Sequence, residues 1–91
     1  METTLEIQRF LNSDGKIKQL PQKQKIKYSV LAYLAGKFEK DRTYTEQEVN
    51  IICSQWHTFS DYFLLRRELV DMGLLCRELN GSRYWRSQEI Q

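Results

Sequence analysis

The sequence is poor in the residues that cross-link a chain or hold a metal ion. It contains two cysteines, Cys53 and Cys76, and one histidine, His57. The cysteines lie in apolar segments without the spacing of a disulfide framework, so we expect reduced thiols in a reducing cytoplasm. Cys53 and His57 have the i,i+4 spacing of one helix face, but two ligands do not complete a zinc site. We therefore predict neither a metal site nor a cofactor.

Signatures of catalysis and of membrane insertion are also missing. One histidine and two apolar-patterned cysteines cannot supply a nucleophile, a base and a group that orients the base. Because glycine-rich phosphate loops are absent as well, we predict that the protein is not an enzyme. No apolar run approaches the roughly 18 residues of a membrane helix. Residues 1–10 lack the charged start and apolar run of a signal peptide, which favours a cytoplasmic protein.

The composition is that of a folded domain with an uneven distribution of charge. Hydrophobic residues make up 41% of the 91 positions and charged residues 29%, as in a single globular domain, here residues 1–91. The formal net charge of +2 permits a nucleic-acid partner without requiring one. Residues 16–27 contain five lysines and no acidic residue, which is typical either of a phosphate-binding surface or of a solvated face.

The first half of the chain predicts a helix, an extended basic arm and a second helix. The apolar spacing of residues 3–12 predicts a short N-terminal helix, followed by a turn. Polar and apolar residues alternate over residues 16–21, so we expect an extended basic arm that Pro21 ends. Apolar residues at helical spacing then predict a helix at about 22–38.

The next two helices have recognisable termini. Thr45 with Glu48 forms a capping-box pattern, and this predicts a helix at about 45–56. Ser60 or Thr58 could cap a further helix at about 60–72. Gly73 is then placed to adopt the left-handed conformation that closes this helix in a Schellman motif.

The C-terminal segment predicts a β-hairpin over residues 75–86. Asn80-Gly81 between two strand-like runs favours a type I′ turn, in which both central residues have positive φ. With that turn, Glu78 faces Arg83 and Cys76 faces Trp85 across the ladder. A third short strand could join the hairpin near Tyr44.

The order of these elements is that of a winged helix-turn-helix. We therefore expect an α+β, mainly helical fold with an extra N-terminal helix and the two-stranded hairpin as its wing. The turn over residues 56–60 is slightly longer than a minimal turn between the two motif helices, but the order of elements is unaffected.

The sequence also resembles a bacterial family known as domain of unknown function 2087. The matching pieces extend from about Phe10 to Arg86. They are Asp14-Gly15, Leu20-Pro21, Phe38-Glu39, Tyr44-Thr45-Glu46, Glu48-Val49-Asn50, Leu65 to Asp71, Gly73-Leu74-Leu75, Arg77, Gly81 and Tyr84-Trp85. Members of this family occur as small free-standing proteins and attached to helix-turn-helix regulators. The resemblance implies a role near transcription, but it assigns no catalytic or binding residue.

Helix 60–72 is the candidate recognition helix for the major groove of DNA. Its periodicity predicts that Tyr62, Leu65, Leu69 and Met72 face the core, that Ser60, Leu64, Arg67 and Asp71 face outward, and that Phe63 and Arg66 lie at the flanks. The basic residues that we predict to contact double-stranded DNA are Lys23, Lys25, Arg66, Arg67, Arg83 and Arg86. The alternative is internal pairing, of Arg67 with Asp71, Arg66 with Glu68, and Arg83 with Glu78.

Two functions follow from this pattern. The first is a nucleic-acid-associated module, accessory to the regulation of transcription. The second is a protein-interaction module that keeps the winged scaffold without binding DNA. It would use an exposed apolar patch formed by Phe59, Phe63 and Leu64.

Overall fold

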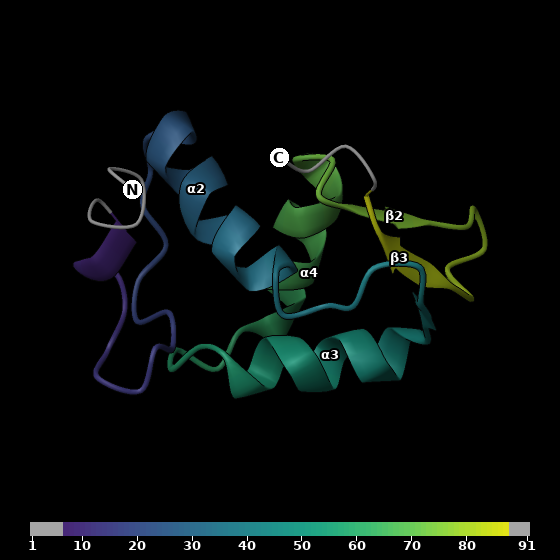
Figure 1. Cartoon of the computed structure of the whole chain (residues 1–91), viewed down its shortest axis with the longest axis horizontal. Helices are drawn as coiled ribbons and strands as arrows, with labels where there is room; N and C mark the ends of the chain where they lie inside the picture. The colour runs from purple at the N-terminus through teal and green to yellow at the C-terminus, as the bar shows by residue number, and fades with distance from the viewer. Residues whose placement is uncertain (1–6, 88–91) are drawn as a thin grey trace.

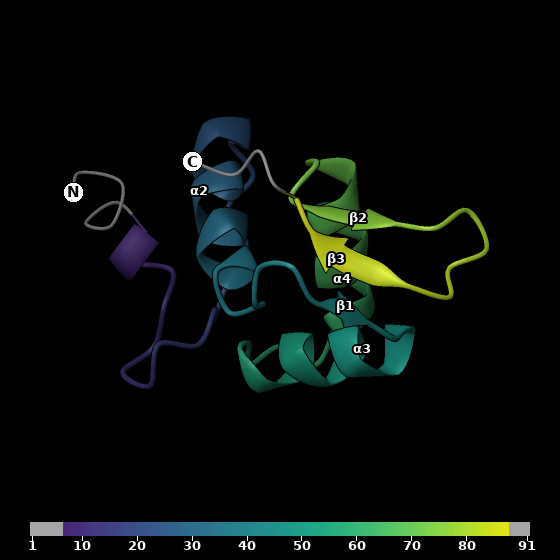
Figure 2. The ribbon, with the colours of Figure 1, turned by 45° about the vertical axis from the view of Figure 1, so that its right-hand side comes forward.

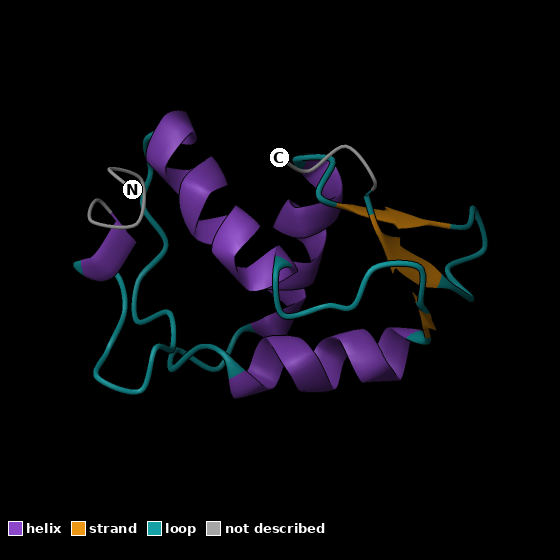
Figure 3. Cartoon of the chain, in the orientation of Figure 1, coloured by secondary structure: helices purple, strands orange, loops and turns teal. Residues whose placement is uncertain are grey.

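Three helices and a three-stranded antiparallel sheet make up the described part of the chain, residues 7–87 of a computed structural model. In chain order the elements are α2 (Gln24–Ala35), β1 (Thr43–Tyr44), α3 (Glu46–Gln55), α4 (Tyr62–Asp71), β2 (Leu75–Arg77) and β3 (Tyr84–Arg86). The helices gather on one side and the hairpin β2–β3 extends away from them (Figure 1, Figure 3). The small α+β class predicted from the sequence is confirmed at this level.

The expected N-terminal helix at 3–12 ends early. Its residues 3–6 lie outside the described residues; residues 7–8 are helical, residues 9–10 form a turn, and Leu11 already pairs with Ile17 as an antiparallel bridge. Asn12 explains the early end, because its side-chain oxygen accepts hydrogen bonds from the backbone N–H groups of Asp14 and Lys16, both at 2.9 Å. Such a side-chain-to-backbone bond competes with helix continuation.

The basic arm, residues 16–21, is attached to the domain through Ile17. The side chain of Ile17 is fully buried. Its backbone N–H donates to the Trp56 carbonyl at 2.7 Å, and its carbonyl accepts from the Thr58 N–H at 3.0 Å. The arm is therefore extended, as predicted, and paired with the connection between α3 and α4.

Helix α2 is shorter than the predicted 22–38. It begins at Gln24 and ends at Ala35, with Gly36 as its C-cap. The N–H groups of Lys37 and Phe38 bond the carbonyls three residues earlier, at 2.9 and 3.0 Å, so the chain tightens instead of continuing as an α-helix. Phe38 is still buried, packed edge-on against Tyr44, as the apolar pattern required.

The capping box of α3 is confirmed. The Thr45 hydroxyl accepts a hydrogen bond from the Glu48 N–H at 3.1 Å, and the Glu48 carboxylate accepts one from the Thr45 N–H at 2.8 Å. Tyr44 and Val49, on either side of the cap, are both buried. The residues around the cap thus determine both where this helix begins and which of its faces is buried.

The predicted cap of α4 was wrong by one residue. The cap is Asp61, whose carboxylate accepts from the Leu64 N–H at 3.1 Å, and neither Ser60 nor Thr58 takes this role. Ser60 instead adopts positive φ, 55°, within the turn that redirects the chain between the helices. The helix therefore begins at Tyr62 and is shorter than the predicted 60–72.

The end of α4 matches its prediction. Gly73 has a φ of 76°. Its N–H donates to the Val70 carbonyl at 3.0 Å, and the Leu74 N–H donates to the Leu69 carbonyl at 2.9 Å. These two bonds are the Schellman motif, which turns the chain from the helix into β2.

The sheet has the order β1-β3-β2, so the third strand joins the hairpin as expected. Cys76 lies opposite Trp85, and the Glu78 N–H donates to the Arg83 carbonyl at 3.0 Å, so the predicted register is confirmed. The type I′ turn is not, because only Gly81 has positive φ. The Gly81 N–H donates to the Glu78 carbonyl at 2.9 Å, which places Leu79 and Asn80 at the centre of the turn. A glycine in left-handed conformation after such a turn preserves the strand twist.

Changing Gly81 to valine is expected to destabilise the protein by about 1–2 kcal/mol, because a β-branched residue at φ 73° is strained. The added Cβ would meet the Arg77 guanidinium at an ordinary 3.8 Å, so the cost is conformational, not a clash. Urea unfolding monitored by circular dichroism measures it, with the exposed Ser82→Val as control. Equal midpoints for the two variants would contradict the turn described here.

One core unites the helices and the sheet. Its buried apolar residues come from every element and from the arm; they include Ile17, Val30, Leu31, Leu34, Phe38, Tyr44, Val49, Cys53, Leu65, Leu69, Leu74, Leu75 and Tyr84. Figure 2 shows α4 between α2 and the sheet, with α3 below them. Among the described residues, no helix combines the length and apolar character needed to cross a bilayer.

Candidate interaction site on helix α4 and the hairpin

The exposed face of α4 is aromatic. Phe63 is 54% exposed and Tyr62 42%, whereas Leu65 and Leu69 are fully buried. The prediction that Tyr62 faces the core was therefore wrong. Tyr62 is the first residue of the helix, at the edge of the domain, where its hydroxyl can stay hydrated. The face that a recognition helix would turn toward DNA thus begins with two large rings.

Arg66 is held within the fold. Its guanidinium lies 3.7 Å from the Glu46 carboxylate and donates a hydrogen bond to the Asn50 side chain, both on α3. It also lies over the Phe63 ring, 5.0 Å from the centroid, and only 14% of its side chain is exposed. The expected alternative partner, Glu68, pairs with Lys27 instead, at 3.7 Å. Arg66 therefore joins α3 and α4.

The other three arginines of the predicted DNA surface also have partners inside the domain. Arg67 pairs with Asp71 at 3.8 Å, and Arg83 pairs with Glu78 at 3.6 Å, as the internal-pairing alternative predicted. Arg86 is half-buried and donates to the Phe38 carbonyl at 3.2 Å. The first two pairs are exposed and weak, so they can exchange, but Arg86 is committed to the core.

The predicted lysines lie elsewhere. Lys23 and Lys25 are exposed at the start of α2, and within residues 7–87 neither forms an ion pair. Lys16 and Lys18 on the basic arm also form no ion pair within these residues, although Lys16 is half-buried, whereas Lys27 is paired with Glu68. The arm and the hairpin lie at opposite ends of the molecule in both ribbon views (Figure 1, Figure 2). The lysines and the hairpin arginines therefore do not form one continuous surface.

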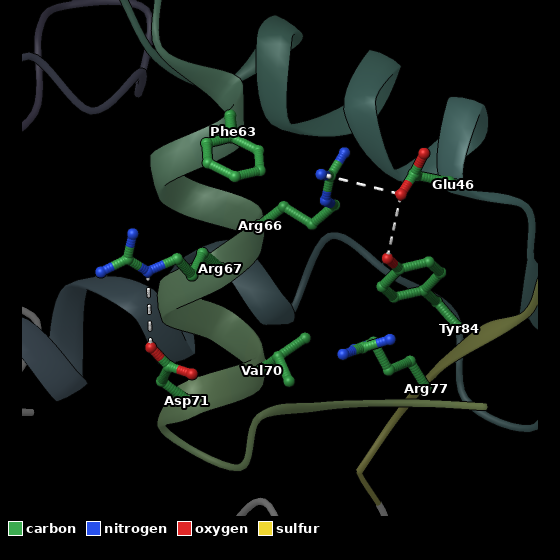
Figure 4. Close-up of a pocket in the computed structure, with 8 residues that line it drawn as sticks. All are labelled: Glu46, Phe63, Arg66, Arg67, Val70, Asp71, Arg77 and Tyr84. Carbon is green, nitrogen blue, oxygen red and sulfur yellow. Dashed lines mark hydrogen bonds and ion pairs between the residues drawn. The ribbon is translucent and has the colours of Figure 1, made fainter. Parts of the chain in front are cut away.

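A pocket of about 310 Å³ opens beside α4, between the start of α3 and the hairpin. Its lining residues are Glu46, Phe63, Arg66, Arg67, Val70, Asp71, Arg77 and Tyr84 (Figure 4). The Tyr84 hydroxyl donates to the Glu46 carboxylate at 3.4 Å, so Glu46 contacts both α4 and β3. Sequence reasoning missed Glu46 and Tyr84 as site residues, because 38 positions separate them and no local pattern links them.

The predicted apolar patch is only partly present. Phe63 is exposed, but Phe59 and Leu64 are half-buried. Phe59 packs edge-on against His57, with 4.6 Å between ring centroids. The exposed apolar surface therefore centres on Phe63 and Tyr62, not on all three residues named from the sequence.

Cys53 and His57 are occupied by structural contacts. Within the described residues, no three histidine, cysteine, aspartate or glutamate side chains gather as metal ligands would. His57 lies against the Cys53 carbonyl through Nδ1 at 2.7 Å, and its Nε2 accepts from the Asp61 N–H at 2.7 Å. The acceptor role of Nε2 assigns the proton to Nδ1, which donates to the carbonyl. Burial raises the pKa of the Cys53 thiol to about 12, opposite to what a nucleophile needs.

Iodoacetamide is expected to modify Cys76 well before Cys53 in the folded protein at pH 8. Cys53 is fully buried and its raised pKa leaves almost no thiolate, whereas Cys76 is half-buried. Peptide mass spectrometry over time measures the two rates, and labelling in guanidinium is the control in which they converge. Equal rates without denaturant would contradict the buried position of Cys53.

Comparison with known proteins gives one match. Residues 16–86 are similar to the family described as an uncharacterized protein conserved in bacteria (DUF2087). Among curated proteins and among solved structures, no match was found.

Proposed function

Since the chain belongs to the bacterial DUF2087 family, which is uncharacterized, we propose a function from geometry: a winged-helix module that docks a protein partner on the exposed face of α4. The sequence favoured nucleic-acid binding over protein docking, and we now place protein docking first. The observation that carries the proposal is the exposure of Phe63 on a helix whose arginines are paired.

The topology supports the winged-helix assignment. Two helices, α3 and α4, follow the short strand β1, and the hairpin β2–β3 follows α4 and pairs back with β1. In winged helix-turn-helix proteins, the element at the position of α4 is the recognition helix and the hairpin is the wing. The surface chemistry of α4 therefore bears directly on what the module binds.

The surface chemistry of α4 favours a protein partner over the base edges of DNA. Helix α4 carries two arginines and two carboxylates, so its formal charge is zero. A helix that enters the major groove needs donors aimed at the bases, and negative charge on it opposes the phosphates. Exposed aromatic rings together with arginine are instead the residues enriched in protein interfaces. Phe63, with Arg66 against its ring, is the proposed anchor.

Site-specific photo-cross-linking in a bacterium that carries the native gene tests this proposal. A photoreactive phenylalanine at position 63 should give discrete protein adducts, because the partner covers that ring. The same group in place of Tyr28, which is 42% exposed on α2, is the control and should give none. Adducts of equal yield at both positions, or at neither, would refute docking on α4.

A second candidate, association with nucleic-acid backbone, rests on the lysines. Lys16, Lys18, Lys23 and Lys25 have no ion pair among residues 7–87, and Asp14 is the nearest acidic residue in sequence. Such a surface suits phosphates irrespective of base sequence, because each contact acts through charge alone. This candidate keeps the predicted role of Lys23 and Lys25 and leaves α4 free for a protein.

The double variant Lys23→Gln, Lys25→Gln is expected to weaken binding to a random duplex and to lower its salt dependence. Two lost phosphate contacts reduce the slope of log affinity against log salt by about 2. Electrophoretic mobility shift at several salt concentrations measures both quantities. Arg67→Gln is the control that leaves the slope unchanged. No shift of the duplex even at low salt would exclude this second function.

A further inference from the structure

The pocket beside α4 has the composition of a carboxylate-binding site. We propose that it receives an aspartate or glutamate side chain of the docked protein, held by Arg77, with an adjacent apolar residue on Phe63 and Val70. This inference rests on the proposed docking function and names the chemistry of the partner. It depends on three observations: the position of Arg77, the charges around it and the apolar wall.

Arg77 is the unpaired cation of this pocket. It lies at the end of β2, and its side chain reaches back toward Val70 of α4 (Figure 4). Within residues 7–87 it forms no ion pair, and it donates a long hydrogen bond, 3.4 Å, to the neighbouring Glu78 carbonyl. Its planar donors therefore remain open to an incoming carboxylate, which arginine binds in a bidentate manner.

The side chains that line the pocket have a net formal charge of +1. Arg67 is balanced by Asp71 and Arg66 by Glu46, so Arg77 is the remainder of three arginines against two carboxylates. Glu46 also accepts from the Tyr84 hydroxyl, which holds it in place. An occupant with a single negative charge would complete the balance. A doubly charged phosphate would meet the fixed carboxylates of Glu46 and Asp71 at close range.

The remaining lining is apolar and shaped for a side chain. In the close-up view, the Tyr84 ring lies between the guanidinium groups of Arg66 and Arg77, and Val70 lies beside the Arg77 guanidinium (Figure 4). Phe63 forms the other end of the same lining and is 54% exposed. A volume of about 310 Å³ is at the lower end of the range for ligand pockets and suits one or two side chains. The fitting motif is thus an acidic residue beside a leucine or an aromatic residue.

Selection from a random peptide display library on the full-length protein tests the inference without knowledge of the partner. The wild type is expected to enrich peptides with Asp or Glu next to a large apolar residue. Arg77→Gln should lose the acidic preference and keep the apolar one, with about tenfold weaker binding of the best peptide. Arg83→Gln, at the residue just before β3 and paired with Glu78, is the matched control and should select as the wild type does.

The outcomes distinguish the carboxylate site from docking on α4. Apolar peptides without an acidic residue would overturn the carboxylate site and leave docking on α4 intact. No enrichment at all, in a protein that melts normally, would overturn both.

Titration of the ¹⁵N-labelled protein gives an independent measurement: phenylacetate should shift the amides of Val70, Arg77 and Tyr84 more than inorganic phosphate does. A stronger response to phosphate would overturn the inference, because the pocket would then prefer a phosphate group to a carboxylate.

Discussion

Replacing Leu65 with alanine is expected to remove about 2–5 kcal/mol of stability, a large share of the roughly 5–15 kcal/mol of a small domain. Leu65 is fully buried on α4 and belongs to the core that joins α2, α3 and the sheet. Truncation removes its transfer free energy and leaves a cavity that neighbouring helices cannot fill. Urea unfolding, with the midpoint and the slope fitted together, measures the loss.

Phe63→Ala provides the matched control on the same helix. Because that ring is 54% exposed, its truncation should change stability by less than about 0.5 kcal/mol, yet it should remove the apolar preference in the peptide selection. The pair thus separates folding from docking within two positions of the chain. A Phe63→Ala variant as unstable as Leu65→Ala would mean that the ring is part of the core and that no docking face exists.

His57→Leu is expected to cost about 1–3 kcal/mol, because it leaves the Asp61 N–H without its acceptor and an unpaired buried polar group costs about that much. The ring of His57 connects the last turn of α3, through the Cys53 carbonyl, to the N–H of Asp61, the cap of α4. Leucine fills similar space but serves neither group. The turn between the motif helices should therefore loosen, and the fall in the unfolding midpoint reports it.

His57→Gln distinguishes hydrogen bonding from packing at this position. Its amide oxygen can reach the place of Nε2 and accept from Asp61, so this variant should recover part of the stability lost in His57→Leu. Thr58→Ala, at an exposed neighbour, should be nearly neutral. Equal midpoints for the leucine and glutamine variants would show that the hydrogen bond from the Asp61 N–H contributes nothing measurable.

Structural features that depend only on neighbouring residues were predictable from the sequence. The capping box of Thr45 and Glu48, the left-handed Gly73 and the hairpin register each depend on a short stretch of chain, and each is confirmed. The cap of α4 was not predictable, because neighbouring residues compete for the capping position. Asp61 caps α4 in place of Ser60 because the turn needs positive φ at Ser60, a preference that the helical pattern does not encode.

The candidate site was less predictable because its contacts join distant elements. Arg66 pairs with Glu46 and Asn50 of another helix, and Tyr84 reaches Glu46 from the last strand. Periodicity predicts which face of a helix is buried, not which carboxylate meets a given arginine. The arginines were therefore placed correctly on α4 and the hairpin, whereas their partners within the fold became known only from the structure.

The position of Glu46 has a thermodynamic consequence. One carboxylate connects the first turn of α3, the Arg66 side chain of α4 and the Tyr84 hydroxyl of β3. Any occupant that draws Arg66 away from Glu46 must also alter the hold on β3, and by reciprocity a change in the hairpin that alters this hold changes the affinity for that occupant. Amide hydrogen exchange in β3 would then act as a remote reporter of events on α4.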